Sequence, residues 1–338
     1  MAILTLVADA RRVFLQEKRL PIRWVNKYHE VRYRRALKRT LARYADLPPI
    51  PCDPQADTEL HMLTCIYDLD MAVAALKSLL RFNPGLAVVI HGDRTLGIEH
   101  RNFLEAQIPG CRVILLEEAD QLISQDDEFA SIRKQIPGRF TLPDGYERQC
   151  AAWALKVLDF YALANTDKVM VLDSDTLFIS RPTELLDWIA GNGESAFHSA
   201  PSESNAQLSS DIVAAGFPGL SYPQKFNGGL FGYSRTMVSR ELVLQVLRTL
   251  LANPEWPLYG DECIWRLILG YVPKQILPFA NYPLIARVGP EARNLVDFDH
   301  ARYVHFIIKH RSGFYQRIAR KVLAQLESDR CTVCSNLG

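Results

Sequence analysis

The strongest constraint on the fold is the stretch 168–178, which reads KVMVLDSDTLF. Residues 169–172 are apolar without polar alternation, which indicates a strand buried on both faces, as in a parallel sheet. Asp173, Ser174 and Asp175 follow where this strand should end. Ligands of open α/β sheets bind at the carboxyl ends of strands, and two close carboxylates repel each other unless a cation lies between them. The stretch therefore predicts a Mn²⁺ or Mg²⁺ site. The alternative is that Asp173 only caps the next element of secondary structure and that Asp175 faces water.

Composition excludes several function classes. The chain has 338 residues and a net charge of +1, which gives no support for a nucleic-acid partner. Its seven cysteines are odd in number and irregularly spaced, which favours a reducing compartment over a disulfide framework. The N-terminus lacks a signal-peptide pattern, and no segment approaches the ~18 apolar residues of a membrane-spanning helix. We therefore expect a cytoplasmic protein, with peripheral binding to the inner face of a membrane left open.

Positive charge is concentrated at the N-terminus, where residues 1–50 carry 12 Lys or Arg against 4 Asp or Glu. Residues 8–46 look helical, with Pro21 breaking the stretch in two. One interpretation is peripheral binding to anionic lipid, with Trp24 at the interface. The other is a helical layer packed on the main domain with a solvated basic face. Residues 47–54, rich in proline, read as an extended linker.

The first half of the main domain alternates strands with helices. Strands are predicted at 61–67, 87–91 and 112–116, and helices at 70–82 and 96–107, so we expect a parallel sheet. A helix and a loop are expected over 119–145. Residues 147–164 predict a long helix on which Arg148 and Lys156 share one face. These cations either point into the site or form a solvated stripe.

The second half carries the remaining polar candidates. After a short helix at 182–189, residues 191–225 predict a long binding loop or lid, and 226–233 (FNGGLFGY) reads as a glycine-rich turn close to a ligand. Helices are expected at 235–253, 258–269 and 314–328, and strands at 272–279 and 303–308. Asp261 and Glu262 open a helix, where acids also serve as simple caps. His305 lies in an apolar strand, where a core histidine is the common alternative.

The order of these motifs resembles the family 8 retaining glycosyltransferases of the GT-A fold, the group of glycogenin and lipopolysaccharide galactosyltransferases. The resemblance covers residues 61–312. It implies a Rossmann-like, three-layer α/β/α fold of the nucleotide-diphospho-sugar transferases with a mostly parallel sheet, preceded by a basic helical region. The corresponding division is residues 1–55 as extension and linker, 56–313 as the GT-A domain and 314–338 as a basic helix and tail.

The resemblance also implies roles for individual residues. Asp173, Asp175 and His305 would hold Mn²⁺ (or Mg²⁺) and the diphosphate of a nucleotide sugar, expected to be a UDP-sugar. Asn227, Asp261 and Glu262 would contact the donor sugar at the reacting centre. The remaining donor-binding candidates are Tyr67, Asp68, Asp93, Lys156, Ser174, Gly228, Gly229, Lys309 and Arg311. The acceptor would be a glycan or a lipid-linked glycan.

Departures from the family pattern leave alternatives open. Ala154 stands where the family often has arginine, and Glu262 replaces an amide. Retention is what the resemblance implies, yet an inverting enzyme would use Glu262 or Asp261 as general base. A haloacid-dehalogenase-like phosphotransferase would use Asp173 as its nucleophile, although Thr176 comes one place early for that motif. A sugar-1-phosphate nucleotidyltransferase and a non-catalytic membrane-associated scaffold are further rivals.

Overall fold

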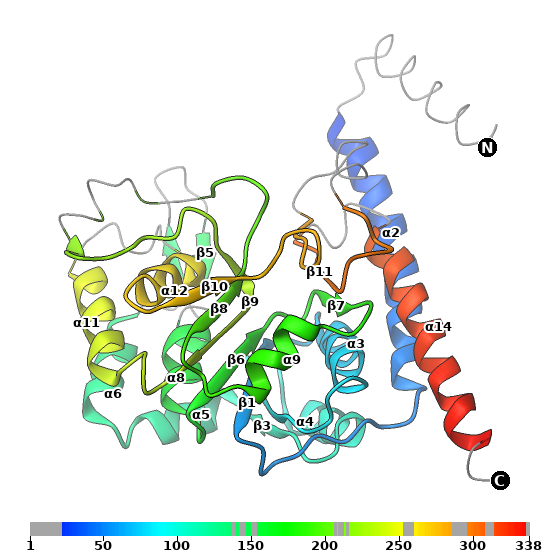
Figure 1. Ribbon diagram of the computed structural model, residues 1–338, viewed down its shortest axis with the longest axis horizontal. Coiled ribbons are helices and arrows are strands. Elements are labelled where there is room, and N and C mark those ends of the chain that lie inside the picture. The colour runs from blue at the N-terminus through cyan, green and yellow to red at the C-terminus, as the bar shows by residue number, and fades with distance from the viewer. Residues whose placement is uncertain are drawn as a thin grey trace.

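The computed structural model describes residues 22–136, 139–141, 147–149, 154–205, 208, 213, 216–252, 260–285, 296–307 and 314–335. A twisted seven-stranded sheet forms its centre (Figure 1). Strands β6, β1, β2 and β3 are parallel to one another. Strand β9 is antiparallel to its neighbours β6 and β8, and β8 and β10 are parallel to each other. The spatial order is β10 (Lys274–Ile276), β8 (Ala196–Ser199), β9 (Asn227–Ser234), β6 (Lys168–Leu172), β1 (Thr58–Thr64), β2 (Ala87–Gly92) and β3 (Arg112–Ile114).

Both faces of the sheet are covered, because its strands supply side chains to two apolar clusters. In β6, Met170 and Leu172 belong to one cluster, and Val169 and Val171 belong to the other. The first cluster includes α3 (Leu69–Leu80) and α4 (Ile98–Gln107), with α9 (Thr183–Ala190) beside them. The second includes α5 (Leu116–Ile123), α6 (Asp127–Gln135), α8 (Phe160–Ala162), α11 (Arg240–Leu251) and α12 (Asp261–Leu269). The prediction of a three-layer α/β/α fold with a mostly parallel sheet is confirmed.

Two long helices from opposite ends of the chain lie side by side against α3: α2 (Ile22–Ala45) and α14 (Phe314–Ser335) (Figure 1). The Tyr44 hydroxyl donates to the Ala319 carbonyl at 2.6 Å. The buried Lys77 ammonium donates to the carbonyls of Tyr44 and Leu47 at 2.9 and 3.0 Å. A cation there satisfies carbonyls at the C-terminus of α2. Within the described chain, no helix has the length and apolar character needed to cross a bilayer.

The predicted helix over 147–164 is wrong at its start, and among the described residues of that range only those from Ala154 to Ala162 are helical. Glu147–Gln149 is strand β5, paired with β4 (Arg139–Thr141). Ala154–Asp159 is a π-helical stretch, η1, which leads into α8. Arg148 and Lys156 therefore lie on different elements and share no helical face. The apolar spacing of 154–164 resembled a regular helix, and only the hydrogen-bond pattern distinguishes a π-helix from an α-helix.

Two predictions in the second half also need correction. The stretch 191–225 is not a continuous loop, because β8 lies within it and joins the central sheet. The glycine-rich stretch after Phe226 is not a turn but the start of β9, a strand buried along its whole length. Its glycines reduce intrinsic strand propensity, yet this strand lies between β6 and β8 in the sheet.

Candidate functional site

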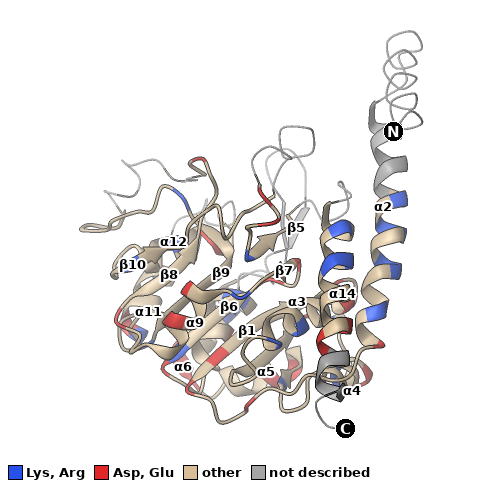
Figure 2. Cartoon of the chain, turned by 45° about the vertical axis from the view of Figure 1, so that its right-hand side comes forward, with Lys and Arg blue, Asp and Glu red and all other residues tan. Residues whose placement is uncertain are grey.

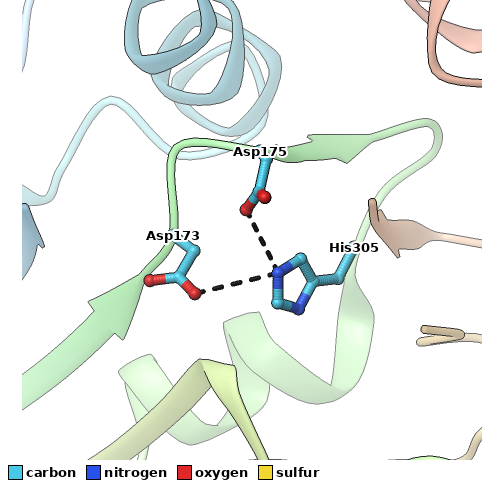
Figure 3. A group of neighbouring side chains, drawn as sticks. All are labelled: Asp173, Asp175 and His305. Carbon is cyan, nitrogen blue, oxygen red and sulfur yellow. Dashed lines mark ion pairs between the residues drawn. The ribbon is translucent and has the colours of Figure 1, made fainter. Parts of the chain in front are cut away.

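The chain brings two carboxylates and an imidazole together just beyond the carboxyl end of β6. Asp173 and Asp175 lie between β6 and β7 (Thr176–Phe178), and β11 (Tyr303–His305) pairs antiparallel with β7. His305 Nε2 is 3.1 Å from Asp175 Oδ1 and 3.7 Å from Asp173 Oδ2. One ligand atom from each residue fits within 4.8 Å of the others, and the three side chains point toward one another (Figure 3). The pairing of β7 with β11 therefore closes the distance between residues 130 positions apart.

Asn227 sets the orientation of this imidazole. Its Oδ1 accepts from the Gly229 amide at 3.0 Å and lies 2.9 Å from His305 Nδ1. Since that oxygen only accepts, Nδ1 carries the proton and Nε2 faces the two carboxylates. Burial alone would lower the pKa of His305, but Asp175 and Asp173 outweigh it and hold the pKa above its ordinary value. A histidine oriented in this way, beside two carboxylates, is a donor set that fits Mn²⁺ or Mg²⁺.

Gly229 has a packing role beside His305. A Cβ added there would lie 2.3 Å from both Cε1 and Nδ1 of His305, which no side-chain adjustment of a fraction of an ångström relieves. The Gly229 carbonyl also accepts from the Asp173 amide at 3.0 Å. Gly228 differs, because a Cβ there would make ordinary contact with Glu262 at 3.5 Å.

Lys156 lies between two acids on the same side of the site. Its Nζ is 2.7 Å from Asp173 Oδ1 and 2.8 Å from Asp261 Oδ2. Burial would lower the pKa of Lys156, but the two carboxylates outweigh it and raise the pKa above its ordinary value. The Trp265 indole donates to the Lys156 carbonyl at 2.9 Å, which ties η1 to α12. Lys156 thus fixes one oxygen of Asp173 and leaves Oδ2 toward His305.

A second polar cluster surrounds Glu262 and includes two residues that the sequence did not single out, Asn205 and Arg266. Glu262 Oε1 accepts from Asn205 Nδ2 at 2.8 Å and from Arg266 at 2.9 Å. Asn205 Nδ2 also donates to the Phe226 carbonyl, while its Oδ1 accepts from the Phe226 amide and from Arg266. The helical i,i+4 spacing of Glu262 and Arg266 was a usable signal, whereas nothing local marks Asn205.

Burial raises the pKa of Glu262 above its ordinary value, although Arg266 opposes the shift. Both acids at the start of α12 therefore have cationic partners: Asp261 pairs with Lys156, and Glu262 pairs with Arg266. The residues are more than helix caps, because each contacts a side chain from outside its own first turn.

The other predicted donor-binding residues follow neighbouring parallel strands. Strand β1 ends at Thr64, three residues before the predicted end, so Tyr67 lies in the following turn and is 77% exposed. Asp68 directly precedes α3. Asp93 follows β2, and its Oδ1 accepts from the Thr95 amide at 2.8 Å. Ser174 is buried between the two site acids. Lys309 and Arg311 lie outside the described residues.

Comparison with solved structures assigns the fold. The chain superposes on the apo structure of the bifunctional glycosyltransferase WbbM with a TM-score of 0.51 at 14% identity, covering 81% of this chain and 52% of WbbM. It thus spans about half the length of WbbM. This similarity shows that the protein has the GT-A fold, as predicted.

Two further solved structures are similar at lower scores. Mouse xyloside xylosyltransferase 1 gives a TM-score of 0.49 at 14% identity, covering 75% of this chain and 99% of that one. The galactosyltransferase LgtC, in complex with donor and acceptor sugar analogues, gives 0.46 at 14% identity, covering 78% and 95%. No protein-family model and no curated protein sequence matches the chain.

Proposed function

We propose that this protein is a metal-dependent glycosyltransferase that moves a sugar from a nucleotide diphosphate sugar, expected to be a UDP-sugar, to a glycan or lipid-linked acceptor. The observation that carries the proposal is the convergence of Asp173, Asp175 and His305 beyond the carboxyl end of a central strand. Ligands of open α/β sheets bind at that edge. Side-chain packing alone gives no reason to bring two acids and a buried histidine together at one point. A bound cation would give that reason, because it offsets the repulsion between the two carboxylates.

The three residues would hold Mn²⁺ or Mg²⁺ through one or two carboxylate oxygens and the Nε2 of His305. Such an ion, when bound, neutralises the negative charge that a diphosphate leaving group gains. Lys156 would hold Asp173 in place, since its ammonium contacts the other carboxylate oxygen. Asn227 would keep the Nε2 lone pair of His305 directed at the ion.

Donor contacts are proposed for the residues around this centre. The Asn227 side-chain nitrogen is buried and has no hydrogen-bond partner among the described residues. An unpaired buried donor of this kind suits a hydroxyl of the donor sugar. Tyr67, Asp68 and Asp93 would contact the nucleoside, because they follow β1 and β2, the first and second strands beside β6 in the sheet. Ser174, Gly228, Gly229, Lys309 and Arg311 are proposed to lie along the diphosphate and the sugar.

Retention of configuration is the proposed stereochemical outcome. An inverting enzyme would need Asp261 or Glu262 as a free general base. Asp261 is paired with Lys156, and Glu262 Oε1 is shared between Arg266 and Asn205. In the retaining reaction the departing diphosphate accepts the proton of the acceptor hydroxyl, so no protein base is needed. No observation favours Asp173 as the nucleophile of a phosphotransferase, because one of its oxygens is committed to Lys156.

The proposal is tested by a thermal-shift panel of nucleoside diphosphates and their sugars, each with and without Mn²⁺, on the wild type and on Asp175→Ala. A ligand that binds only the native state raises the melting temperature by mass action. We expect one nucleoside diphosphate to stabilise the wild type only with Mn²⁺ and to lose that effect in Asp175→Ala. The exposed Asp57, before β1, supplies the control Asp57→Asn, which should respond like the wild type. Absence of any nucleotide response in the wild type would overturn the proposal.

A further inference from the structure

The outward face of α2 carries a straight row of cations. Arg32, Arg35, Arg39 and Arg43 follow one another at intervals of three and four residues and are exposed. This spacing places residues on one side of a helix. The opposite side, with Leu37, Leu41 and Tyr44, is buried in the apolar core. We call the four arginines the α2 stripe; Figure 2 shows Lys and Arg along this helix.

The stripe is costly for the helix, so its charges require a reason beyond solubility. Like charges four residues apart destabilise an isolated helix, and α2 carries eight Lys or Arg against one acid. Arg43 pairs with Glu327 at 2.7 Å. Within the part of the chain that the structure describes, no acidic side chain forms an ion pair with Arg32, Arg35 or Arg39. Three charges of the row are thus available to an anionic partner.

The helix presents the stripe rigidly. Lys77 donates to the carbonyl of Tyr44 in the last turn of α2, to that of Leu47 just beyond the helix, and to Gln107 Oε1. The Gln107 amide in turn donates to the Ala45 carbonyl. Tyr44 fixes the same end to α14. At a rise of about 1.5 Å per residue, the row from Arg32 to Arg43 extends about 17 Å along the helix, so it matches an extended surface better than a pocket-sized anion.

The sequence of α2 carries aromatic residues ahead of the stripe. Trp24 and Tyr28 precede Arg32 at intervals of four, and Val31 is 42% exposed. Aromatic residues next to arginines are typical of helices that lie in the interface of an anionic bilayer. A soluble polyanion would also bind the arginines, but it would not explain why aromatic residues precede them in the sequence.

We propose that the α2 stripe docks the protein on an anionic phospholipid membrane, with α2 lying along the bilayer surface. The inference deepens the proposed function by naming the surface that would bring the enzyme to a lipid-linked acceptor. Vesicle binding needs neither donor nor acceptor, so its failure is distinguishable from failure of the proposed enzymatic activity.

The test is co-sedimentation of the full chain with phosphatidylcholine vesicles that contain or lack phosphatidylglycerol. The stripe variant is Arg32→Gln, Arg35→Gln and Arg39→Gln. Its matched control removes three exposed cations from other elements, Arg94→Gln, Lys134→Gln and Arg181→Gln. Each cation near an anionic surface contributes about a fivefold gain in partitioning, so the stripe variant should lose on the order of a hundredfold.

We expect the wild type and the control to sediment only with the anionic vesicles, less so at high salt. We expect the stripe variant to remain in solution with a melting temperature no lower than that of the wild type. If the stripe variant and the control lost vesicle binding equally, net charge alone would explain the binding, and the proposal would be overturned. So would equal binding of the wild type to both kinds of vesicle, or binding to heparin with none to vesicles.

Discussion

At the scale of single residues, the site depends on how one imidazole is held. His305 lies between the two acids on one side and Asn227 and Gly229 on the other. The sequence identified all of these residues. It did not show that a glycine is needed at position 229 to leave room for the His305 ring, because that contact joins β9 to β11, which are distant in sequence. Their proposed roles in donor binding remain predictions.

Gly229→Ala should displace His305, since the new Cβ would lie 2.3 Å from the ring. Overpacking of this kind costs about 1–3 kcal/mol of folding free energy, and a misplaced ligand should weaken Mn²⁺ binding about tenfold or more. Urea unfolding and Mn²⁺ titration measure the two effects. Gly228→Ala is the control, since its Cβ meets Glu262 at an ordinary 3.5 Å. Similar losses in both variants would contradict this explanation.

Asn205→Ala should destabilise the protein, because the Asn205 amide uses both of its N–H donors and accepts two hydrogen bonds. Its removal leaves Glu262 and the Phe226 backbone short of partners, at a cost of about 2–4 kcal/mol. The change in unfolding free energy in urea measures this cost. Asn192→Ala, at an exposed loop position, should stay within about 0.5 kcal/mol. A loss below about 1 kcal/mol for Asn205→Ala would show that solvent replaces these bonds.

At the scale of secondary-structure elements, the sequence predicted the segments in which the spacing of apolar residues fits only one kind of element. The strand before Asp173, the helix after β1 and the helix that begins at Asp261 lie where their apolar patterns placed them. Strand β9 was missed because Gly229 and Gly232 depress strand propensity. Both glycines are explained by distant rings, since a Cβ at Gly232 would lie 2.4 Å from Phe197. Tertiary contacts thus override local preference, and no local pattern reveals them.

Strands β1 and β2 place two histidines against each other in the core, which predicts acid sensitivity. His61 Nδ1 is 2.9 Å from His91 Nε2, and both rings are buried against Phe160. Burial lowers the pKa of His61, and it lowers that of His91 further below the usual value. The unfolded chain therefore binds more protons near pH 6, so folding stability should fall as pH drops below about 6.5.

His91→Asn should reduce this acid sensitivity. Between about pH 7.5 and about pH 5 we expect the wild type to lose roughly 1–2 kcal/mol more unfolding free energy than the variant, since one pKa unit corresponds to about 1.4 kcal/mol. Urea unfolding at the two pH values gives the difference. His300→Asn changes a histidine whose side chain is 81% exposed and should behave like the wild type. An identical pH dependence in wild type and His91→Asn would exclude this pair as the cause.

At the scale of the whole molecule, the site joins segments that are distant in sequence. The connection from β6 to β7 supplies the acids, β11 the histidine, β9 the asparagine, and η1 with α12 the Lys156–Asp261 pair. The strand–helix order predicted the sheet and the edge at which these residues meet. It did not predict the packing of α2 against α14, because that contact depends on side chains almost 300 residues apart. The proposed division into extension, GT-A domain and tail remains a prediction.

The most direct test of the central claim is Mn²⁺ binding followed by electron paramagnetic resonance, in which the signal of free Mn²⁺ decreases as the ion binds. Titrations with UDP, and separately with GDP, would compare the wild type with Asp175→Asn, His305→Gln and the exposed control Asp57→Asn. We predict that the wild type and the control bind Mn²⁺ together with one of the nucleotides, and that Asp175→Asn and His305→Gln bind it at least about tenfold more weakly. Undiminished binding by both site variants would contradict the assignment of Asp173, Asp175 and His305 as the metal site.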